Sequence, residues 1–324
     1  MQAVVVEEYG GPEVLTLQER PAPEPGPGQV SIDVRFASVN FTDVRNRIGD
    51  GLGRVPFVPG VEVSGTVRQL GEGVEGLRIG QPVAALTRGS AHADVATALA
   101  ALTVELPEGL LDRPESGAML VAVPLAIMLL RRVAWLQPDE TALLHSAAGG
   151  VGTVAAQLAT HFGLRPLLGT VGSEDKIPFA RRYGFAEVFT YDTFVDGVRE
   201  ATGGRGVDVV LDPLGGAVRS ASFDLLAPFG RLVNYSNVSR EPEAAPDGEW
   251  MRAHCVAYVG YSAGQLSVYD PMLLRPAFEE AVGLVADGVL DLGVTGVFPL
   301  AEVAEAHRRF ADRSATGKLV LAVG

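Results

Sequence analysis

A glycine-rich segment near the middle of the chain carries the strongest chemical signal in the sequence. The stretch "LLHSAAGGVGTVAAQLA" is an apolar strand that breaks at Gly149, turns through Gly150, Val151 and Gly152, and continues as an amphipathic helix. Glycine lets a backbone approach a pyrophosphate closely, and the free N–H groups at a helix start meet its negative charge. A tight structural turn is the plain alternative. Glycines placed between a strand and a helix favour dinucleotide binding.

The end of the next strand, "RPLLGTV", indicates which nicotinamide cofactor this turn would hold. An acidic residue there, about 20 residues past the glycines, usually binds a free ribose 2′-hydroxyl. This chain has Gly172 instead, followed by Ser173 and Lys176. A hydroxyl and a compact cation can together hold a 2′-phosphate, although Glu174 and Asp175 would oppose it unless they point to solvent. We therefore predict NADPH.

Lys176 is one of only two lysines among the 26 Lys and Arg residues of the chain, and Lys318 is the other. Because arginine is used almost everywhere else, we expect the two remaining lysines to have specific roles. A solvated residue in the first turn of a helix is the alternative for Lys176.

Composition and charge favour a small-molecule enzyme. The 324 residues are 47% hydrophobic and carry a net charge of −13 without a basic cluster, so neither nucleic acid nor an anionic membrane is an expected partner. The N-terminal segment lacks a secretory signal. The most apolar run, residues 118–130, is shorter than the roughly 18 residues that span a bilayer, and predicts a buried helix. We expect a cytoplasmic protein.

The cysteine and histidine content argues against a metal site. Cys255 is the single cysteine, which excludes a disulfide framework or a multi-cysteine metal site, and we expect it to be a buried, inert thiol. The five histidines include no pair at ligand spacing. We predict no metal.

The order of apolar segments predicts an α/β protein with two kinds of domain. The first part of the chain contains short apolar or alternating runs separated by Pro and Gly, which is typical of a compact β domain. From about residue 118, strands alternate with helices, which indicates a doubly wound parallel sheet. Residues 238–275 have no clear pattern and suit a lid or an interface. A helix with Val303, Ala306 and Phe310 on one face precedes a terminal strand.

Six segments in order resemble the medium-chain dehydrogenase/reductases, and within them the zinc-independent quinone oxidoreductase branch that includes zeta-crystallin and related enoyl reductases. They are "VNFTDVRNRIG", "FVPGVEVSGTVRQLGEGV", "HSAAGGVG", "GTVGSEDK", "VVLDPLGG" and "TGKLVLAVG". The resemblance covers essentially the whole chain. It implies a GroES-like catalytic domain of residues 1–118, completed by 286–324, and a Rossmann NADPH-binding domain of 119–285. It also implies a homodimer.

The resemblance assigns roles to individual residues of the cofactor site. Gly149, Gly150, Val151 and Gly152 match the family's pyrophosphate turn, and Ser173, Lys176 and Tyr191 match its 2′-phosphate grip. Asn237 falls where the family contacts the nicotinamide half of the cofactor. Lys318 matches a lysine that lies near the cofactor.

Other positions depart from relatives. Asn40 and Val61 stand where the zinc-dependent branch has a cysteine and a histidine ligand. Arg45 replaces a tyrosine that many quinone oxidoreductases carry, and Val123-Pro124-Leu125 replaces a Gly-Leu-Thr that faces the nicotinamide. These changes leave the cofactor pattern intact but alter the substrate side.

The resulting hypothesis is an NADPH-dependent reductase of a quinone or an α,β-unsaturated carbonyl compound. Asn40 and Arg45 would donate hydrogen bonds to the carbonyl oxygen as it gains charge, and Asp43 would orient their loop. A turn-capping amide and a surface ion-pair partner are the alternative roles of Asn40 and Arg45. A non-redox tailoring enzyme that cyclises or isomerises its substrate, or a non-catalytic cofactor-binding protein, are the alternative functions.

Overall fold

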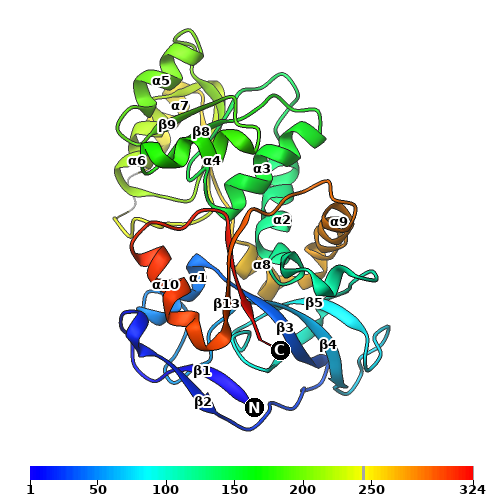
Figure 1. Cartoon of the computed structure of the whole chain (residues 1–324). Helices are drawn as coiled ribbons and strands as arrows, with labels where there is room; N and C mark the ends of the chain where they lie inside the picture. Colours follow the sequence, from blue (N-terminus) through cyan, green and yellow to red (C-terminus); the bar gives the residue numbers. More distant parts are fainter. Residues whose placement is uncertain (243–244, 324) are drawn as a thin grey trace. The chain divides into compact units, whose positions relative to one another are not determined.

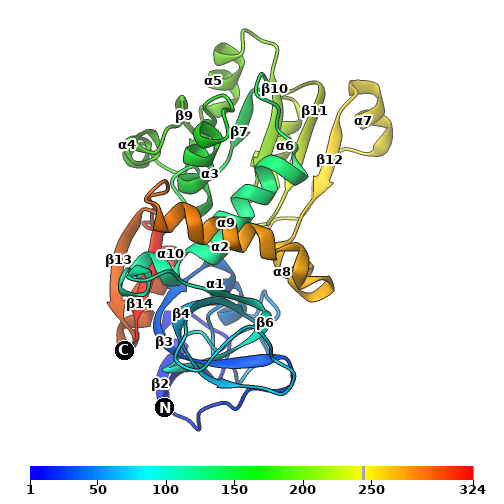
Figure 2. The same cartoon turned by 90° about the vertical axis from the view of Figure 1, so that its right-hand side faces the viewer.

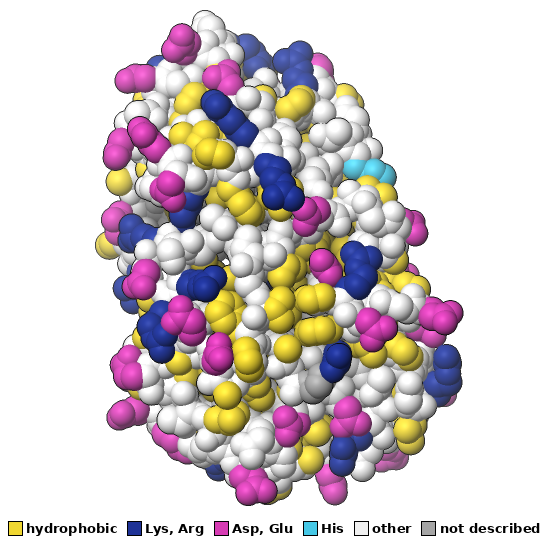
Figure 3. All heavy atoms as spheres, in the orientation of Figure 1, with side chains coloured by type: hydrophobic (Ala, Val, Ile, Leu, Met, Phe, Trp, Pro, Cys, Tyr) yellow, Lys and Arg dark blue, Asp and Glu magenta, His cyan; other side chains and the backbone are white. Residues whose placement is uncertain are grey.

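A computed structural model of the chain describes residues 1–242 and 245–323. The chain divides into two compact units (Figure 1). The first unit comprises residues 1–124 and 266–324, and the second comprises residues 125–265. The domain limits inferred from the sequence, 118/119 and 285/286, stay a prediction. On the face shown in Figure 3, basic side chains lie scattered among acidic ones, in keeping with the acidic net charge.

The first unit is built on a six-stranded sheet with the order β13-β14-β3-β4-β5-β6. Because β3 also pairs with β6, strands β3 to β6 close on themselves. Strands β1 and β2 form a separate antiparallel pair. The strands are β1 (Gln2–Val6), β2 (Leu15–Glu19), β3 (Gln29–Val39), β4 (Glu62–Leu70), β5 (Pro82–Thr87), β6 (Val95–Glu105), β13 (Val294–Pro299) and β14 (Lys318–Ala322).

The last strand of the chain belongs to this first sheet. β14 runs parallel to β13 and antiparallel to β3 (Figure 2). Leu319 and Leu321 join Val30 and Ile32 of β3 in one buried cluster, because their side chains alternate onto the inner face. The C-terminal segment therefore completes the core of the N-terminal strands.

Two helices connect strands of the first sheet, and three others lie in the chain segments at or near the limits between the two units. The predicted C-terminal helix is present as α10, and it buries Val303, Ala306 and His307 at helical spacing. The predicted buried helix at 118–130 is also confirmed, since α2 is apolar and enclosed. Within the described residues, no helix is both long and apolar enough to cross a membrane. The helices are α1 (Phe41–Arg47), α2 (Met119–Met128), α8 (Ala263–Tyr269), α9 (Arg275–Ala286) and α10 (Val303–Ala311).

The second unit is a six-stranded, fully parallel sheet with the order β12-β11-β10-β7-β8-β9. Counted from its first strand, this is the 3-2-1-4-5-6 order of the doubly wound dinucleotide-binding fold. The predicted α/β fold class is confirmed. The strands are β7 (Ala142–Leu144), β8 (Leu168–Val171), β9 (Glu187–Thr190), β10 (Val207–Asp212), β11 (Leu226–Asn234) and β12 (Ala257–Gly260).

Helices connect consecutive strands of the second sheet (Figure 2). Leu143, Val210, Phe194 and Phe223 pack in the core between one face of the sheet and its helices. The segment 238–275, for which the sequence suggests a lid or an interface, supplies α7, β12 and α8, while its residues 243–244 lie outside the described residues. Its role stays a prediction. The helices are α3 (Gly150–His161), α4 (Ile177–Arg182), α5 (Phe194–Ala201), α6 (Gly216–Phe223) and α7 (Gly248–His254).

Candidate functional site

The glycine-rich turn lies at the switch point of the parallel sheet. β7 is central, with β8 on one side and β10 on the other, and ligands of such sheets bind beyond the carboxyl ends of the strands at this point. Gly149 is the N-cap of α3, which begins at Gly150 directly after the turn. The first-turn N–H groups of a helix have no acceptor within the helix, so they can bind a phosphate.

The backbone at this turn tolerates no added side chain at Gly152. A Cβ there would lie 2.4 Å from the carbonyl oxygen of Ala147, and backbone cannot move aside as a side-chain tip can. Ser146, just before the turn, has φ of 62°, a left-handed conformation uncommon for a non-glycine residue. Such local strain concentrates at functional sites.

Tyr191 lies beside the end of the second strand of this unit. A Cβ on Gly172 would be 3.6 Å from Cε2 of Tyr191, and the Tyr191 hydroxyl is 3.3 Å from Oγ of Ser146. The ends of β7, β8 and β9 are thereby linked through one phenol. The structure brings Tyr191 to the place where the sequence expected the 2′-phosphate grip.

Ser173 and Lys176 follow Gly172 in a short 3-10 turn, Glu174–Lys176. Lys176 is half-buried, and burial lowers the pKa of its ammonium while Asp175 raises it. Glu174 and Asp175 are both exposed, which meets the condition that the sequence analysis set for a phosphate beside them. The donors present here suit a 2′-phosphate.

Asn237 lies in the loop after β11. Its Oδ1 accepts hydrogen bonds from Oγ of Ser239 at 3.0 Å and from N of Arg240 at 3.2 Å. A Cβ on Gly215 would lie 2.3 Å from the same oxygen, so the amide packs directly on the turn after β10. Glycine at 215 allows this close approach.

A buried ion pair that the sequence analysis missed underlies that loop and turn. Nε of Arg219 lies 2.5 Å from Oδ2 of Asp212, and both side chains are fully buried. Nη2 of Arg219 also donates to Oδ1 of Asn234 and to the carbonyl oxygen of Ser236. Asp212 accepts from the N–H groups of residues 214–215. The sequence does contain a signal for this pair. Asp212 ends the apolar stretch "VVLD", and a charge in a buried strand needs a partner.

In the first unit, strand register brings together four polar residues from three strands. Leu319 pairs with Val39, which sets Lys318 opposite Asn40 at the ends of β14 and β3. Ala37 pairs with Val63, which sets Ser38 opposite Glu62. We call Ser38, Asn40, Glu62 and Lys318 the buried quartet, since each is at most 8% exposed.

The quartet forms a closed hydrogen-bond network. Nζ of Lys318 donates to Oε1 of Glu62 at 2.8 Å, to Oδ1 of Asn40 at 2.7 Å and to Oγ of Ser38 at 3.1 Å. Nδ2 of Asn40 donates to Oγ of Ser38 and to Oε1 of Glu62, and Ser38 Oγ donates to the same Glu62 oxygen. Glu62 and Ser38 were not singled out from the sequence.

Asp43 fixes the loop behind Asn40, as the sequence analysis proposed. Its carboxylate accepts the N–H of Asn40 at 2.8 Å and the N–H of Gly60 at 3.1 Å. Full burial raises the pKa of Asp43 to about 7, and the charge of Glu62 adds to this, while the two N–H groups and Lys318 oppose it. Asp43 therefore changes charge near neutral pH.

Arg45 lies on α1 and pairs with the loop that follows the helix. Its Nε is 3.2 Å from Oδ2 of Asp50, and its Nη2 donates to the carbonyl oxygen of Asp50 at 2.8 Å. The side chain is 34% exposed. The structure thus shows Arg45 in its alternative role, as an ion-pair partner. These contacts to Asp50 use Nε and Nη2 and do not involve Nη1.

Arg47, two positions after Arg45 on α1, is 2% exposed, although its sequence context suggests a solvated arginine. Its Nε and Nη1 are buried without a hydrogen-bond partner, as are both ring nitrogens of His307. The ring of His92 lies 6.0 Å from that of His307. Burial lowers the pKa of both histidines, to about 4 for His92. Arg47 is buried because α10, the helix that carries His307, packs against α1.

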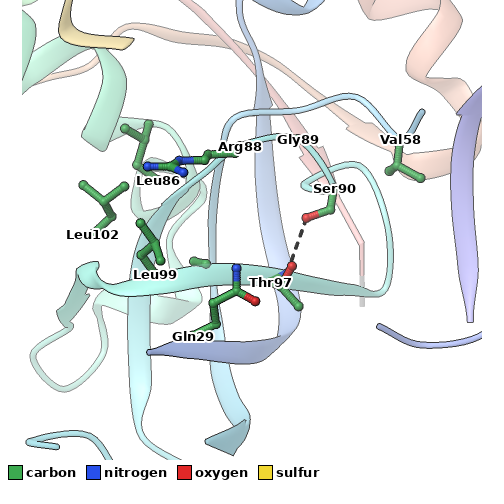
Figure 4. Close-up of a pocket in the computed structure, with 10 residues that line it drawn as sticks. Gln29, Val58, Leu86, Arg88, Gly89, Ser90, Thr97, Leu99 and Leu102 are labelled. Carbon is green, nitrogen blue, oxygen red and sulfur yellow. Dashed lines mark hydrogen bonds between the residues drawn. The ribbon is translucent and has the colours of Figure 1, made fainter. Parts of the chain in front are cut away.

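A cavity of about 390 Å³ lies elsewhere in the first unit, between β5 and β6 (Figure 4). Leu86, Leu99 and Leu102 form its apolar wall, and Arg88 and Ser90 lie at its polar side. None of the quartet residues lines it. The cavity is therefore separate from the buried quartet.

Cys255 is exposed, so the expectation of a buried thiol is wrong. It ends α7 in the left-handed conformation, with φ of 52°. In the described part of the chain, no three His, Cys, Asp or Glu side chains are grouped to hold a metal ion.

Two family models match the chain. The model described as alcohol dehydrogenase GroES-like domain matches residues 26–106, and the model described as zinc-binding dehydrogenase matches residues 183–321. A quinone oxidoreductase of Pseudomonas aeruginosa is 33% identical and covers 97% of each chain. A 2-haloacrylate reductase of a Burkholderia species is 31% identical and covers 99% of this chain and 98% of its own. The chain belongs to the medium-chain dehydrogenase/reductase superfamily, in its zinc-independent quinone oxidoreductase branch.

Proteins with other names are also similar to this chain. The synaptic vesicle membrane protein VAT-1 homolog of Mus musculus is 31% identical and covers 100% of this chain and 84% of its own. Among solved structures, a mycobacterial protein complexed with NADPH is 31% identical, with a TM-score of 0.91, and covers 99% of this chain and 100% of its own. The predicted family is confirmed, and the first unit is its GroES-like domain.

The residues present fit the family's cofactor better than its metal. The helix start after the glycine turn, and a strand end with a lysine and no carboxylate at Gly172, have the chemistry that a phosphorylated dinucleotide requires. At the two positions where the zinc-dependent branch has metal ligands, this chain has Asn40 and Val61. The Asn40 side chain is hydrogen-bonded within the quartet, and the Val61 side chain has no atom that can bind a metal.

Proposed function

We propose that this chain reduces a quinone or an α,β-unsaturated carbonyl compound by hydride transfer from NADPH. The protein is an NADPH-dependent oxidoreductase of the quinone and enoyl reductase type. The observation that carries the proposal is the glycine turn at the switch point, joined to a strand end that offers Lys176 and no carboxylate at Gly172. The quinone and 2-haloacrylate reductases among its relatives support the choice of substrate class.

The proposed cofactor contacts are divided between backbone and side chains. The N–H groups at Gly149, Gly150, Val151 and Gly152 would hold the pyrophosphate, and Ser173, Lys176 and Tyr191 the 2′-phosphate. Asn237 would lie toward the nicotinamide. When bound, NADPH supplies the hydride. The position of Asn237 on the turn at Gly215 supports its part in this arrangement.

The proposed substrate contacts come from the GroES-like unit. As the electrophilic carbon gains the hydride, an electron pair moves onto the carbonyl oxygen, and N–H donors aimed at that oxygen lower the barrier. Asn40 and Arg45 are the proposed donors, and Asp43 holds the backbone of Asn40. The proton that completes the reduction comes from water.

Purified protein, NADPH deuterated at the transferable position and a panel of enones and quinones test this function. We expect acceptor-dependent loss of NADPH absorbance, and one deuterium at the β-carbon of the reduced enone. A product formed without NADPH would favour the non-redox alternative. Binding of NADPH without consumption by any acceptor would contradict the reductase assignment.

We also propose that the chain forms a homodimer. β12 is an edge strand of the parallel sheet, and its outer N–H and C=O groups can pair with a second copy. Light scattering should then give about twice the chain mass of 34.0 kDa. A mass of one chain at micromolar concentration would contradict this.

A further inference from the structure

We propose that Lys318 and Glu62 form a positioning pair that sets the orientation and the donor strength of the Asn40 amide. This inference rests on the proposed reductase function and on the proposed role of Asn40 in it. It assigns Lys318 a task inside the GroES-like unit, in contrast to the cofactor contact that the family resemblance implied.

The hydrogen-bond inventory of Asn40 fixes its amide in one direction. Oδ1 accepts from the Lys318 ammonium at 2.7 Å, while Nδ2 donates to Ser38 at 2.9 Å and to Glu62 at 3.0 Å. A flipped amide would point its N–H groups at an ammonium and its oxygen at a carboxylate. The charged pair therefore excludes the flipped orientation.

All three N–H groups of Lys318 are used within the quartet. Their acceptors are Ser38, Asn40 and Glu62, at 3.1, 2.7 and 2.8 Å. The Lys318 side chain is 4% exposed. A compact ammonium suits three converging acceptors, whereas a planar guanidinium does not. This geometry explains a lysine here in a chain that has only one other lysine.

Glu62 leaves one N–H of Asn40 available for exchange. Its Oε1 receives three donors, from Ser38, Lys318 and Asn40, although a carboxylate oxygen has about two lone-pair sites. The Asn40 contact, at 3.0 Å, is the longer of the two N–H contacts to this oxygen. Because the amide is planar, this N–H keeps its direction, and a substrate oxygen would share it with Glu62 as a second acceptor while Lys318 holds and polarises the amide from Oδ1.

The test compares Lys318→Met, Glu62→Gln and the double variant with the wild type. Each single variant leaves one buried charge unpaired, which destabilises the fold, whereas the double variant removes both charges. We expect Lys318→Met to lower kcat roughly 10- to 100-fold, less than loss of a direct donor. The Kd for NADPH, measured by fluorescence titration, should change less than about threefold.

The double variant separates positioning from stability. We expect it to regain most of the thermal stability that the single variants lose, because no buried charge is left alone. Its kcat should stay as low as that of Lys318→Met, because Asn40 has lost its orienting cation. Arg68→Met is the matched control, since Arg68 lies on β4, the strand of Glu62, and forms an exposed ion pair with Asp33 of β3. Its kcat should equal that of the wild type.

Two results would overturn the positioning pair alone. One is a double variant with wild-type kcat, which would make the pair merely structural. The other is a Lys318→Met variant with unchanged kcat and a Kd for NADPH raised about tenfold or more, which would make Lys318 a cofactor contact. A wild-type protein that turns over no quinone or enone would instead overturn the proposed function, and this inference with it.

Discussion

The two units use the same device, a buried cation paired with a carboxylate, for different ends. In the GroES-like unit, Lys318 and Glu62 lie 2.8 Å apart and bind the side chain of Asn40. In the Rossmann unit, Arg219 and Asp212 lie 2.5 Å apart and bind mostly main-chain groups of the loops after β10 and β11. One pair orients a side chain, and the other shapes a backbone.

This difference matches the chemistry of the two cations. Lysine presents three donors from one atom, which suits three side-chain oxygens that converge on a point. Arginine presents five donors in a plane, and Arg219 uses them on partners spread over two loops and the Tyr258 hydroxyl. The type of cation therefore follows from the shape of what it must hold.

Breaking the pair of the Rossmann unit should have the largest effect. Arg219→Met leaves Asp212 as an unpaired charge in a fully buried place, and we expect the free energy of unfolding to fall by about 3–5 kcal/mol. Urea unfolding measures this. Arg199→Met, in an exposed pair with Asp196, is the control and should change stability by less than about 0.5 kcal/mol. An equal change in both variants would contradict the prediction.

On the substrate side, we expect Arg45→Ala to lower turnover. If Arg45 donates to the substrate oxygen, its loss should reduce kcat about 100- to 1000-fold, with little change in the Kd for NADPH. Steady-state kinetics of Arg45→Ala beside Arg68→Ala provides the test, because Arg68 is a solvated arginine of the same unit. Wild-type turnover in both variants would leave Arg45 as the ion-pair partner of Asp50 only.

Acid should weaken the Rossmann unit through His145. This ring is fully buried between Oγ1 of Thr170 and Oγ of Ser222, each at 2.8 Å, and burial lowers its pKa to about 4. Because the pKa is lower in the folded state than the unfolded value of 6.5, the stability from His145 is present above about pH 6.5 and is lost as the pH falls toward 4.

The loss from His145 amounts to about 3 kcal/mol across that range. His145→Gln keeps a donor and an acceptor, so its unfolding free energy should depend less on pH than that of the wild type. Urea unfolding at neutral and at mildly acidic pH measures the two slopes, and equal slopes would contradict the prediction. Asp43 acts in the opposite sense, because the stability from its raised pKa is fully present below the unfolded value of 3.8 and is lost as the pH rises toward 7.

The smallest expected effect is a change in cofactor preference when Lys176 is replaced. Lys176→Ala should reduce the preference for NADPH over NADH roughly 10- to 150-fold, the value of a charge-assisted contact of about 1.5–3 kcal/mol. Titration with both cofactors measures it. Arg181→Ala, exposed on the following helix, is the control. Equal wild-type affinity for NADPH and NADH would contradict the role of Lys176.

Local patterns in the sequence were enough to predict the phosphate-binding elements of the Rossmann unit. The glycines at 149–152 lie between a strand and a helix because the phosphate-binding turn, its strand and its helix are contiguous in sequence. The same holds for Gly172 and the turn with Lys176. Each of these features depends on residues within a few positions of one another.

Features that depend on distant pairing could not be predicted in this way. Lys318 meets Glu62 only because β14 pairs with β3 and β3 with β4, and no local pattern gives that register. Arg47 resembles a loop residue until the helix carrying His307 covers it. The strand β12 was missed because its four residues have no alternating apolar pattern.

The single cysteine gives this protein a natural attachment point for a spectroscopic probe. Cys255 is exposed and precedes β12 by two positions, so one maleimide spin label per chain can be attached without mutagenesis. In a dimer joined through β12 edges, the two labels would lie close to the symmetry axis, and pulsed dipolar spectroscopy would report one narrow separation. A monomer would report none.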